Sequence, residues 1–155
     1  MSDQLLKTMK RRLWLMGWVK IPLIAYTQPR LVSINDEQVE VSLKLRRRTR
    51  NHLKSMYFGA LAIAADVCGG IHAFYYAEKL NCQVSFAFKS MHAEFMQRAE
   101  SDCLFTCKDG LKVKAAMQES LQSGERINEK VCVQVSNSNH EPVAAFEMEI
   151  SVKCK

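Results

Sequence analysis

The sequence predicts an α+β fold in which a six-stranded antiparallel sheet wraps around one long buried helix. Three observations lead to this fold class. Residues 57–77 carry one formal charge, Asp66, and are apolar on nearly all sides, which is typical of a helix that is buried all round. Six other stretches alternate apolar and polar residues with the period of two that a strand requires. The central helix is the only element apolar enough to cover one face of such a sheet.

The first element is a predicted helix over residues 3–18. Its apolar residues recur at spacings of three and four, with basic residues between them. Trp14 and Trp18 lie four apart and therefore share one face. We favour a helix packed on the body of the domain, and the alternative is a basic amphipathic helix that touches a membrane or a partner. Pro22 and Pro29 then interrupt the pattern.

The next predicted element is a hairpin, and a basic run follows it. Residues 30–34 and 38–45 are separated by Asn35-Asp36-Glu37, which is a turn signal. The run of residues 46–50 contains four arginines and immediately precedes the central helix. Such a run is often a solvated loop, but here the phosphates of a ligand could reach it.

The rest of the chain reads as four more strands and one short helix. The alternating segments are residues 84–88, 103–107, 131–136 and 144–151, and residues 94–98 either extend the first of them or lead to the next. Residues 111–123 favour a short helix that Gly124 ends.

The central segment is also long enough to span a bilayer. It is rich in Ala and Gly, however, and carries Asp66 near its centre and His72 further on. A carboxylate at the centre of a bilayer costs about 2.5–3.5 kcal/mol on insertion scales. We therefore predict a buried core helix and no integral membrane span.

Length, charge and cysteines limit the class of protein. The 155 residues, 48% hydrophobic and 25% charged, fit a single domain over residues 1–155. Residues 1–60 hold 12 Lys and Arg against 4 Asp and Glu, a net charge of +8, whereas residues 61–155 hold 10 against 12, a net charge of −2. The basic half could face the phosphates of a nucleotide-bearing cofactor, a nucleic acid or a membrane surface, or it could be a solvated face.

The six cysteines do not have the spacing of a metal site. None forms a CxxC pair, and no His or Cys pair supplies the second half of a zinc site. We expect small buried side chains in a reducing compartment and no metal; these cysteines are Cys68, Cys82, Cys103, Cys107, Cys132 and Cys154. The polar start of the chain and the lack of a small-x-small cleavage site predict a cytoplasmic location.

The order of elements and the central stretch resemble the hotdog fold of acyl-CoA thioesterases. Within that superfamily, the chain is most similar to a branch of hotdog-domain proteins near the phenylacetate-pathway (PaaI-like) thioesterases. Their pattern is an Asn, five variable residues, His-Gly-Gly, and an Asp seven residues after the last Gly. Asn51, Gly59 and Asp66 fall in register with it. The resemblance implies a hotdog core over residues 25–155, with residues 1–24 as a helical extension.

This chain departs from the pattern at two positions of the motif. Tyr57 stands at the His and Phe58 at the first Gly. A tyrosine can hydrogen-bond a thioester carbonyl, but it cannot replace the imidazole as a base near neutral pH. Lys54 also stands at a position often held by Gly.

The resemblance implies thioester hydrolysis at a site shared between two subunits of a homodimer or a dimer of dimers. Asp66 would activate a water or attack directly, Gly59 would offer its amide as an oxyanion donor, and Asn51 would orient the water or the carboxylate. The basic side chains Arg46, Arg47, Arg48, Arg50 and Lys54 would meet the phosphates of coenzyme A. Coenzyme A is then part of the substrate, and no separate cofactor is expected.

Two functions remain open from the sequence, and a third is disfavoured. The first is a small acyl-CoA thioesterase. The alternative is a non-catalytic protein that binds an acyl thioester or fatty acyl group, which the pair Tyr57 and Phe58 favours because it changes the polarity and volume of the site. Nucleic-acid binding would rest on the arginine run alone, without interleaved aromatic residues that stack bases, so no nucleic-acid partner is predicted.

Overall fold

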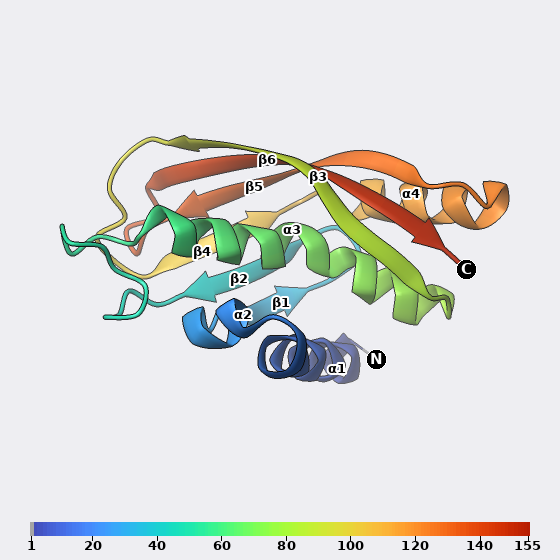
Figure 1. Cartoon of the computed structure of the whole chain (residues 1–155), viewed down its shortest axis with the longest axis horizontal. Helices are drawn as coiled ribbons and strands as arrows, with labels where there is room; N and C mark the ends of the chain where they lie inside the picture. Colours follow the sequence, from blue (N-terminus) through green and yellow to red (C-terminus); the bar gives the residue numbers. More distant parts are fainter. Residues whose placement is uncertain (1) are drawn as a thin grey trace.

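The computed structural model describes residues 2–155. Its helical elements are α1 (Ser2–Leu15), the π-helical turn η1 (Met16–Lys20), α2 (Pro22–Thr27), α3 (Phe58–Leu80) and α4 (Gly110–Ser123). Its strands are β1 (Arg30–Ile34), β2 (Val39–Leu43), β3 (Val84–Phe95), β4 (Cys103–Cys107), β5 (Ile127–Ser136) and β6 (Pro142–Cys154). Figure 1 shows these elements in sequence colours.

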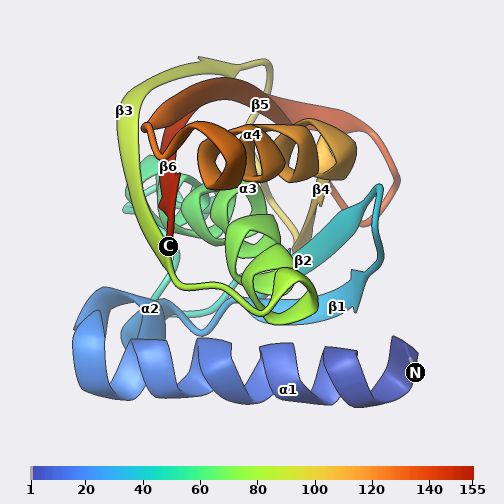
Figure 2. The same cartoon turned by 90° about the vertical axis from the view of Figure 1, so that its right-hand side faces the viewer.

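The six strands form one antiparallel sheet in the order β1-β2-β4-β5-β6-β3. The sheet curls around α3, as the end-on view in Figure 2 shows, and the predicted fold class is confirmed. The strand beginning at Val84 continues to Phe95, so the segment after residue 88 extends the strand instead of starting a new one. β1 and β3 are the two edges of the sheet.

The core lies between the concave face of the sheet and α3. Val41, Phe105 and Phe146 alternate inward from three strands and are fully or almost fully buried. Gly69 lets α3 approach the sheet closely, because a Cβ there would lie 2.5 Å from the methyl carbon of Met148. Small residues on the helix and β-branched or aromatic residues on the strands therefore fill the space between the two layers.

α3 is the one helix of the described part of the chain that is long and apolar enough to cross a membrane. Of the 18-residue apolar stretch of this helix, however, 67% is buried inside the protein. The sheet supplies the covering that a bilayer would otherwise supply, so α3 is the predicted core helix and not an integral membrane span.

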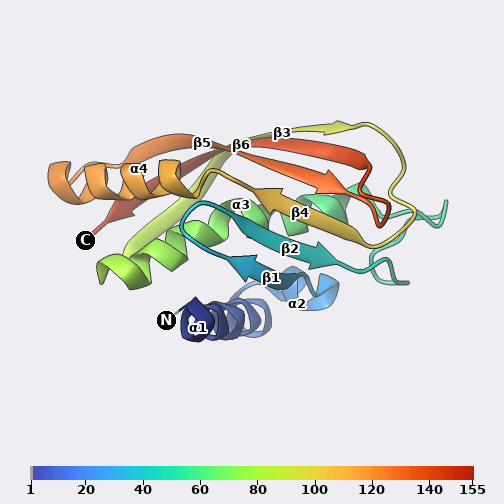
Figure 3. The ribbon, with the colours of Figure 1, turned by 180° about the vertical axis from the view of Figure 1, so that it is seen from behind.

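The N-terminal helices form a separate layer beneath α3 and the β1 edge (Figures 1 and 3). Met9, Leu13 and Ile24 attach this layer to the body through buried side chains. Helix structure continues beyond the predicted end at residue 18, because Pro22 occupies the first turn of α2, where the missing N–H costs nothing.

The face of the N-terminal helix that carries the tryptophans is not the face that packs on the domain, since Trp14 and Trp18 are 60% and 63% exposed. One expectation about buried side chains is wrong. Cys132 is exposed, because it stands on the outward-facing side of β5, whereas Cys68, Cys103, Cys107 and Cys154 are buried as expected.

Candidate active site

Asp66 stands on the one stripe of α3 that the sheet does not cover. Its neighbours Ala64 and Ala65 are fully buried against the strands, whereas Ala62, Ile63 and Asp66 are partly exposed. The helical spacing of three and four places these partly exposed residues on one face. The sheet therefore leaves room for a ligand along this stripe.

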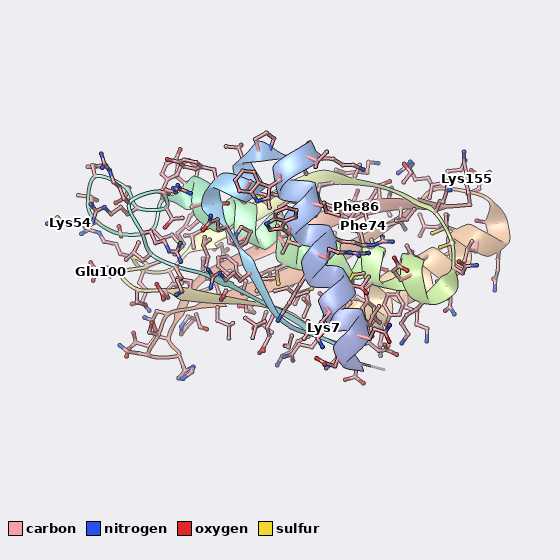
Figure 4. The ribbon with its side chains drawn as sticks, turned by 90° about the horizontal axis from the view of Figure 1, so that it is seen from below. Lys7, Lys54, Phe74, Phe86, Glu100 and Lys155 are labelled. Carbon is pink, nitrogen blue, oxygen red and sulfur yellow. The ribbon has the colours of Figure 1, made fainter. Side chains whose placement is uncertain are left out.

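A cavity of about 420 Å³ borders Asp66. One wall is α3, another is the start of β3, and the N-terminal helices close the third side. Phe74 and Phe86, whose ring centres are 5.9 Å apart, lie beside α1 in Figure 4. The lining is predominantly apolar, as in pockets that hold the hydrocarbon part of a ligand; its charged members are Arg12, Lys20 and Asp66.

The carboxyl group of Asp66 has an unusual pKa for an aspartate. Burial disfavours its charged form and raises its pKa from 3.8 to about 6. Burial is the one cause of this rise, and Arg12, which lines the same cavity, forms an ion pair with Glu78. A carboxylate that is half protonated near pH 6 is suited to accept a proton from a reacting water close to neutral pH.

The raised pKa predicts a stability effect with a definite sign. The folded protein binds the Asp66 proton more tightly than the unfolded chain does. The contribution of this proton to the free energy of unfolding is therefore fully present below about pH 4 and is lost as the pH rises through about 6. Asp66→Asn cannot ionise, so at pH 7 it should be more stable than the wild type, by on the order of 1–3 kcal/mol. Melting temperatures at pH 4 and pH 7 check this, and a difference between the two proteins that does not change with pH would contradict it.

Gly59 and Tyr57 lie together at the start of α3. Tyr57 is the N-cap residue and offers no side-chain hydrogen bond to the helix, so the amides of the first turn remain without intrahelical partners. The ring of Tyr57 lies over Gly59, where a Cβ would overlap Cε1 of the ring. A side chain at position 59 would therefore displace the Tyr57 ring. The helix dipole also favours negative charge at this end.

Asn51 organises the loop that leads into α3. Its Oδ1 accepts hydrogen bonds from the amides of Leu53 and Ser55 at 2.9 and 3.2 Å, and from the Ser55 hydroxyl at 3.2 Å. These bonds occupy the carbonyl end of the side chain, so only the Nδ2 donor is available to a ligand.

One chain does not bring Asp66 and Gly59 together. They are seven positions apart in the helix, which places them about 10 Å apart along the axis and on nearly the same face. Asp66 and Gly59 of a single chain therefore cannot both contact one reacting atom.

The predicted phosphate-binding residues lie in the loop before α3. Arg46, Arg47, Arg48, Arg50 and Lys54 are all exposed, with Lys54 at the tip of the loop in Figure 4. Arg46 donates to Gln28 Oε1 at 3.1 Å, and the Arg48 guanidinium lies 5.3 Å from the ring centre of Tyr26. Two of these arginines are thus held against the end of α2.

The sequence did not reveal that the N-terminal layer and β3 form part of the Asp66 cavity. Arg12, Lys20 and Phe86 come from segments that no motif links to the central helix. Alternation and helical spacing show which side of an element is apolar, but not which other element covers it. Over residues 2–155 no three His, Cys, Asp or Glu side chains gather as a metal site would require.

Comparison with solved structures places the architecture among known proteins. A candidate thioesterase from Shewanella oneidensis is 17% identical, with a TM-score of 0.81 over 95% of this chain and 99% of that one. A protein of unknown function from Chlorobaculum tepidum is 12% identical, with a TM-score of 0.83 over 98% and 96%. A thioesterase from Haemophilus influenzae is 9% identical, with a TM-score of 0.66 over 89% and 87%.

These likenesses show that the chain has the hotdog fold, so the predicted resemblance is confirmed at the level of the fold. None of these three proteins is described as a phenylacetate-pathway thioesterase, so that finer resemblance stays a prediction. No curated protein sequence matches the chain. One family model, described as a domain of unknown function, matches residues 10–152. The chain therefore belongs to the DUF4442 family.

Proposed function

We propose that the protein hydrolyses an acyl thioester, with Asp66 as the catalytic carboxylate. The observation that carries this proposal is a carboxyl group with a pKa of about 6 on the wall of an apolar cavity of about 420 Å³. An unpaired carboxylate in such surroundings is costly, and a functional role is the usual reason for keeping one. The similarity of the fold to thioesterases supports the choice of reaction class.

In the proposed reaction a water oxygen attacks the thioester carbonyl while Asp66 takes the water proton. A tetrahedral oxyanion forms, and the carbon–sulfur bond then breaks. The thiolate leaves and receives the proton from Asp66, which regenerates the carboxylate. The products are a carboxylic acid and a thiol, and no external oxidant or reductant is needed.

The start of α3 is the proposed oxyanion site. The free amides near Gly59 point out of the helix, and the hydroxyl of Tyr57 can donate a further hydrogen bond to the carbonyl oxygen. The Nδ2 group of Asn51 is available to orient the water or the acyl group. Tyr57 serves in this proposal only as a hydrogen-bond donor.

The proposed site needs a second copy of the chain. β3 is an edge strand of twelve residues, and its second half exposes Met91 and Phe95. Phe58 of α3 lies beside Phe95, whereas Asp66 lines the same cavity as Phe88, further back along the same strand. Antiparallel pairing of two β3 edges would therefore bring Asp66 of one subunit toward Gly59 of the other. A homodimer is the smallest assembly that completes the site, and a dimer of dimers repeats it.

Coenzyme A is the proposed thiol carrier, with its phosphates on the arginine loop. Replacing Arg47 and Arg50 with Gln leaves the contacts of Arg46 and Arg48 with α2 in place. Acyl-CoA should bind roughly tenfold more weakly to this variant at low salt, and the difference should shrink by 0.5 M salt because exposed charges are screened over about 8–10 Å. Titration calorimetry at two salt concentrations measures this difference in affinity. Equal affinities of the wild type and the variant at low salt would mean that these arginines lie in a solvated loop and do not bind the phosphates.

Acyl binding without hydrolysis is the second candidate function. The observation in its favour is the ring of Tyr57, which covers Gly59 at the proposed oxyanion site. A hydrolysis screen over short, medium, long and aromatic acyl-CoA substrates separates the two functions. Release of free thiol above the Asp66→Asn background supports the enzyme. Saturable binding with no release from any substrate supports the binding protein and overturns the enzyme.

A further inference from the structure

The N-terminal layer carries an exposed apolar surface that the proposed reaction does not use. Two adjacent rows of α1 and η1 continue outward from the buried row of Met9 and Leu13. Lys10, Trp14 and Trp18 form one row and Arg11, Leu15 and Val19 the other, all at spacings of four and all exposed. α2 adds Leu23 and Tyr26, which are 62% and 55% exposed. We call these eight residues the N-terminal aromatic surface.

The residues of this surface are held together by the local fold. Gly17 lets η1 pack directly on α2, because a Cβ there would lie 3.0 Å from the Ala25 amide nitrogen. The rings of Trp14 and Trp18 are 6.2 Å apart and border a hollow of about 440 Å³ together with Ala25 and Pro29. The two tryptophans and α2 therefore present one surface.

Positive charge surrounds the apolar side chains. Lys10 and Arg11 stand one turn before the tryptophan and leucine of their rows, and neither has an acidic partner among residues 2–155. Arg48 lies over the Tyr26 ring and joins the arginine loop to this surface. Residues 1–60 contain 12 basic side chains and 4 acidic ones. The occupant must accordingly combine an apolar interior with anionic groups at its boundary.

We propose that the N-terminal aromatic surface docks on a bilayer that contains anionic lipids. Tryptophan and tyrosine favour the boundary between headgroups and acyl chains, and nearby lysine and arginine bind anionic headgroups. α1 lies flat along the base of the molecule in Figure 2. A helix that binds at the membrane interface lies parallel to the bilayer surface in the same way. A second copy of the chain fits less well, because self-association would place Lys10 and Arg11 against like charges.

Docking there would also place the Asp66 cavity next to the lipid. Met9, Leu13 and Met16 line that cavity from the same helices whose outer rows form the surface. The proposal does not depend on hydrolysis, however, since it rests on the outer side of the N-terminal layer alone.

The chain has two tryptophans, and both lie on this surface, so their fluorescence reports docking directly. The probe is vesicles of phosphatidylcholine with or without about one third phosphatidylserine. With phosphatidylserine, emission should move to shorter wavelength and lipids brominated on their acyl chains should quench it. Both effects should weaken as salt rises. Sedimentation with the vesicles should show the matching bound fraction.

Three variants make the test specific. Trp14→Ser with Trp18→Ser, and separately Val19→Ser with Leu23→Ser, should each lower vesicle binding at least tenfold with unchanged melting temperature, because these side chains are exposed. Leu111→Ser with Leu121→Ser, at exposed positions on α4 across the molecule, should bind vesicles like the wild type. The absence of binding to anionic vesicles at low salt would overturn the proposal. So would equal loss in the α4 variant, or an emission shift that grows with protein concentration without lipid, which would indicate a protein interface.

Discussion

Replacing Asp66 with Asn should lower thioester hydrolysis by a factor on the order of 10²–10⁴, the range for loss of a positioned general base. Asparagine has nearly the same size as aspartate but cannot accept the water proton. Substrate binding should persist, because the apolar walls of the cavity are unchanged. Initial rates and binding affinity, measured on the same samples with the best substrate of the acyl-CoA screen, test this directly.

The control for this variant is Glu119→Gln, the same chemical change at an exposed position of α4, which should hydrolyse at the wild-type rate. In the wild type, kcat/KM should rise with pH through about 6 as Asp66 ionises, and the residual rate of Asp66→Asn should lack that rise. Together with the stability prediction, the variant should be more stable at pH 7 and much less active. Wild-type hydrolysis by folded Asp66→Asn would remove Asp66 from the mechanism.

The fold could be predicted because its signals are local. Alternation identified β2, β4 and β6, and the uncharged stretch identified α3, since a sheet needs one apolar partner for its face. The position of Asp66 could also be predicted as the one charge in that stretch. Its exposure on a stripe open to a cavity follows from the curvature of the sheet, which no local pattern encodes.

The walls of the cavity could not be predicted, because they depend on contacts between distant segments. Phe86 and Met9 are far apart in sequence: the path of β3 across α3 brings Phe86 to the Asp66 cavity, and the packing of α1 beneath α3 brings Met9 there. For the N-terminal helix, the spacing of the tryptophans predicted that they share one face, but not whether that face is buried. The structure buries the face that carries Met9 and Leu13 and leaves the tryptophans exposed.

The second large effect concerns the sharing of the site between subunits. If Asp66 of one subunit acts with Gly59 of the other, each homodimer holds two composite sites. Gly59→Val should be inactive although Asp66 is intact, because the added side chain overlaps the Tyr57 ring and blocks approach to the first-turn amides. A heterodimer of Gly59→Val and Asp66→Asn carries both changes in one site and neither in the other.

Assembly through β3 has its own matched pair of variants. Met91→Asp places two like charges near each other across paired β3 edges and should shift the protein toward monomer in sedimentation, with a parallel loss of turnover. Val32→Asp introduces the same charge at a similarly exposed position on β1, the opposite edge of the sheet, and should leave assembly and turnover unchanged.

The most direct measurement mixes Asp66→Asn and Gly59→Val in equal amounts after dissociation and reassembly, and records hydrolysis by the mixture. Random pairing makes half of the dimers mixed, with one intact site of two, so turnover should recover to about a quarter of the wild-type value. Adding Met91→Asp to both chains should abolish the recovery. A mixture whose heterodimers are demonstrated by mass spectrometry, but which stays as inactive as its components, would contradict a catalytic site shared between two subunits.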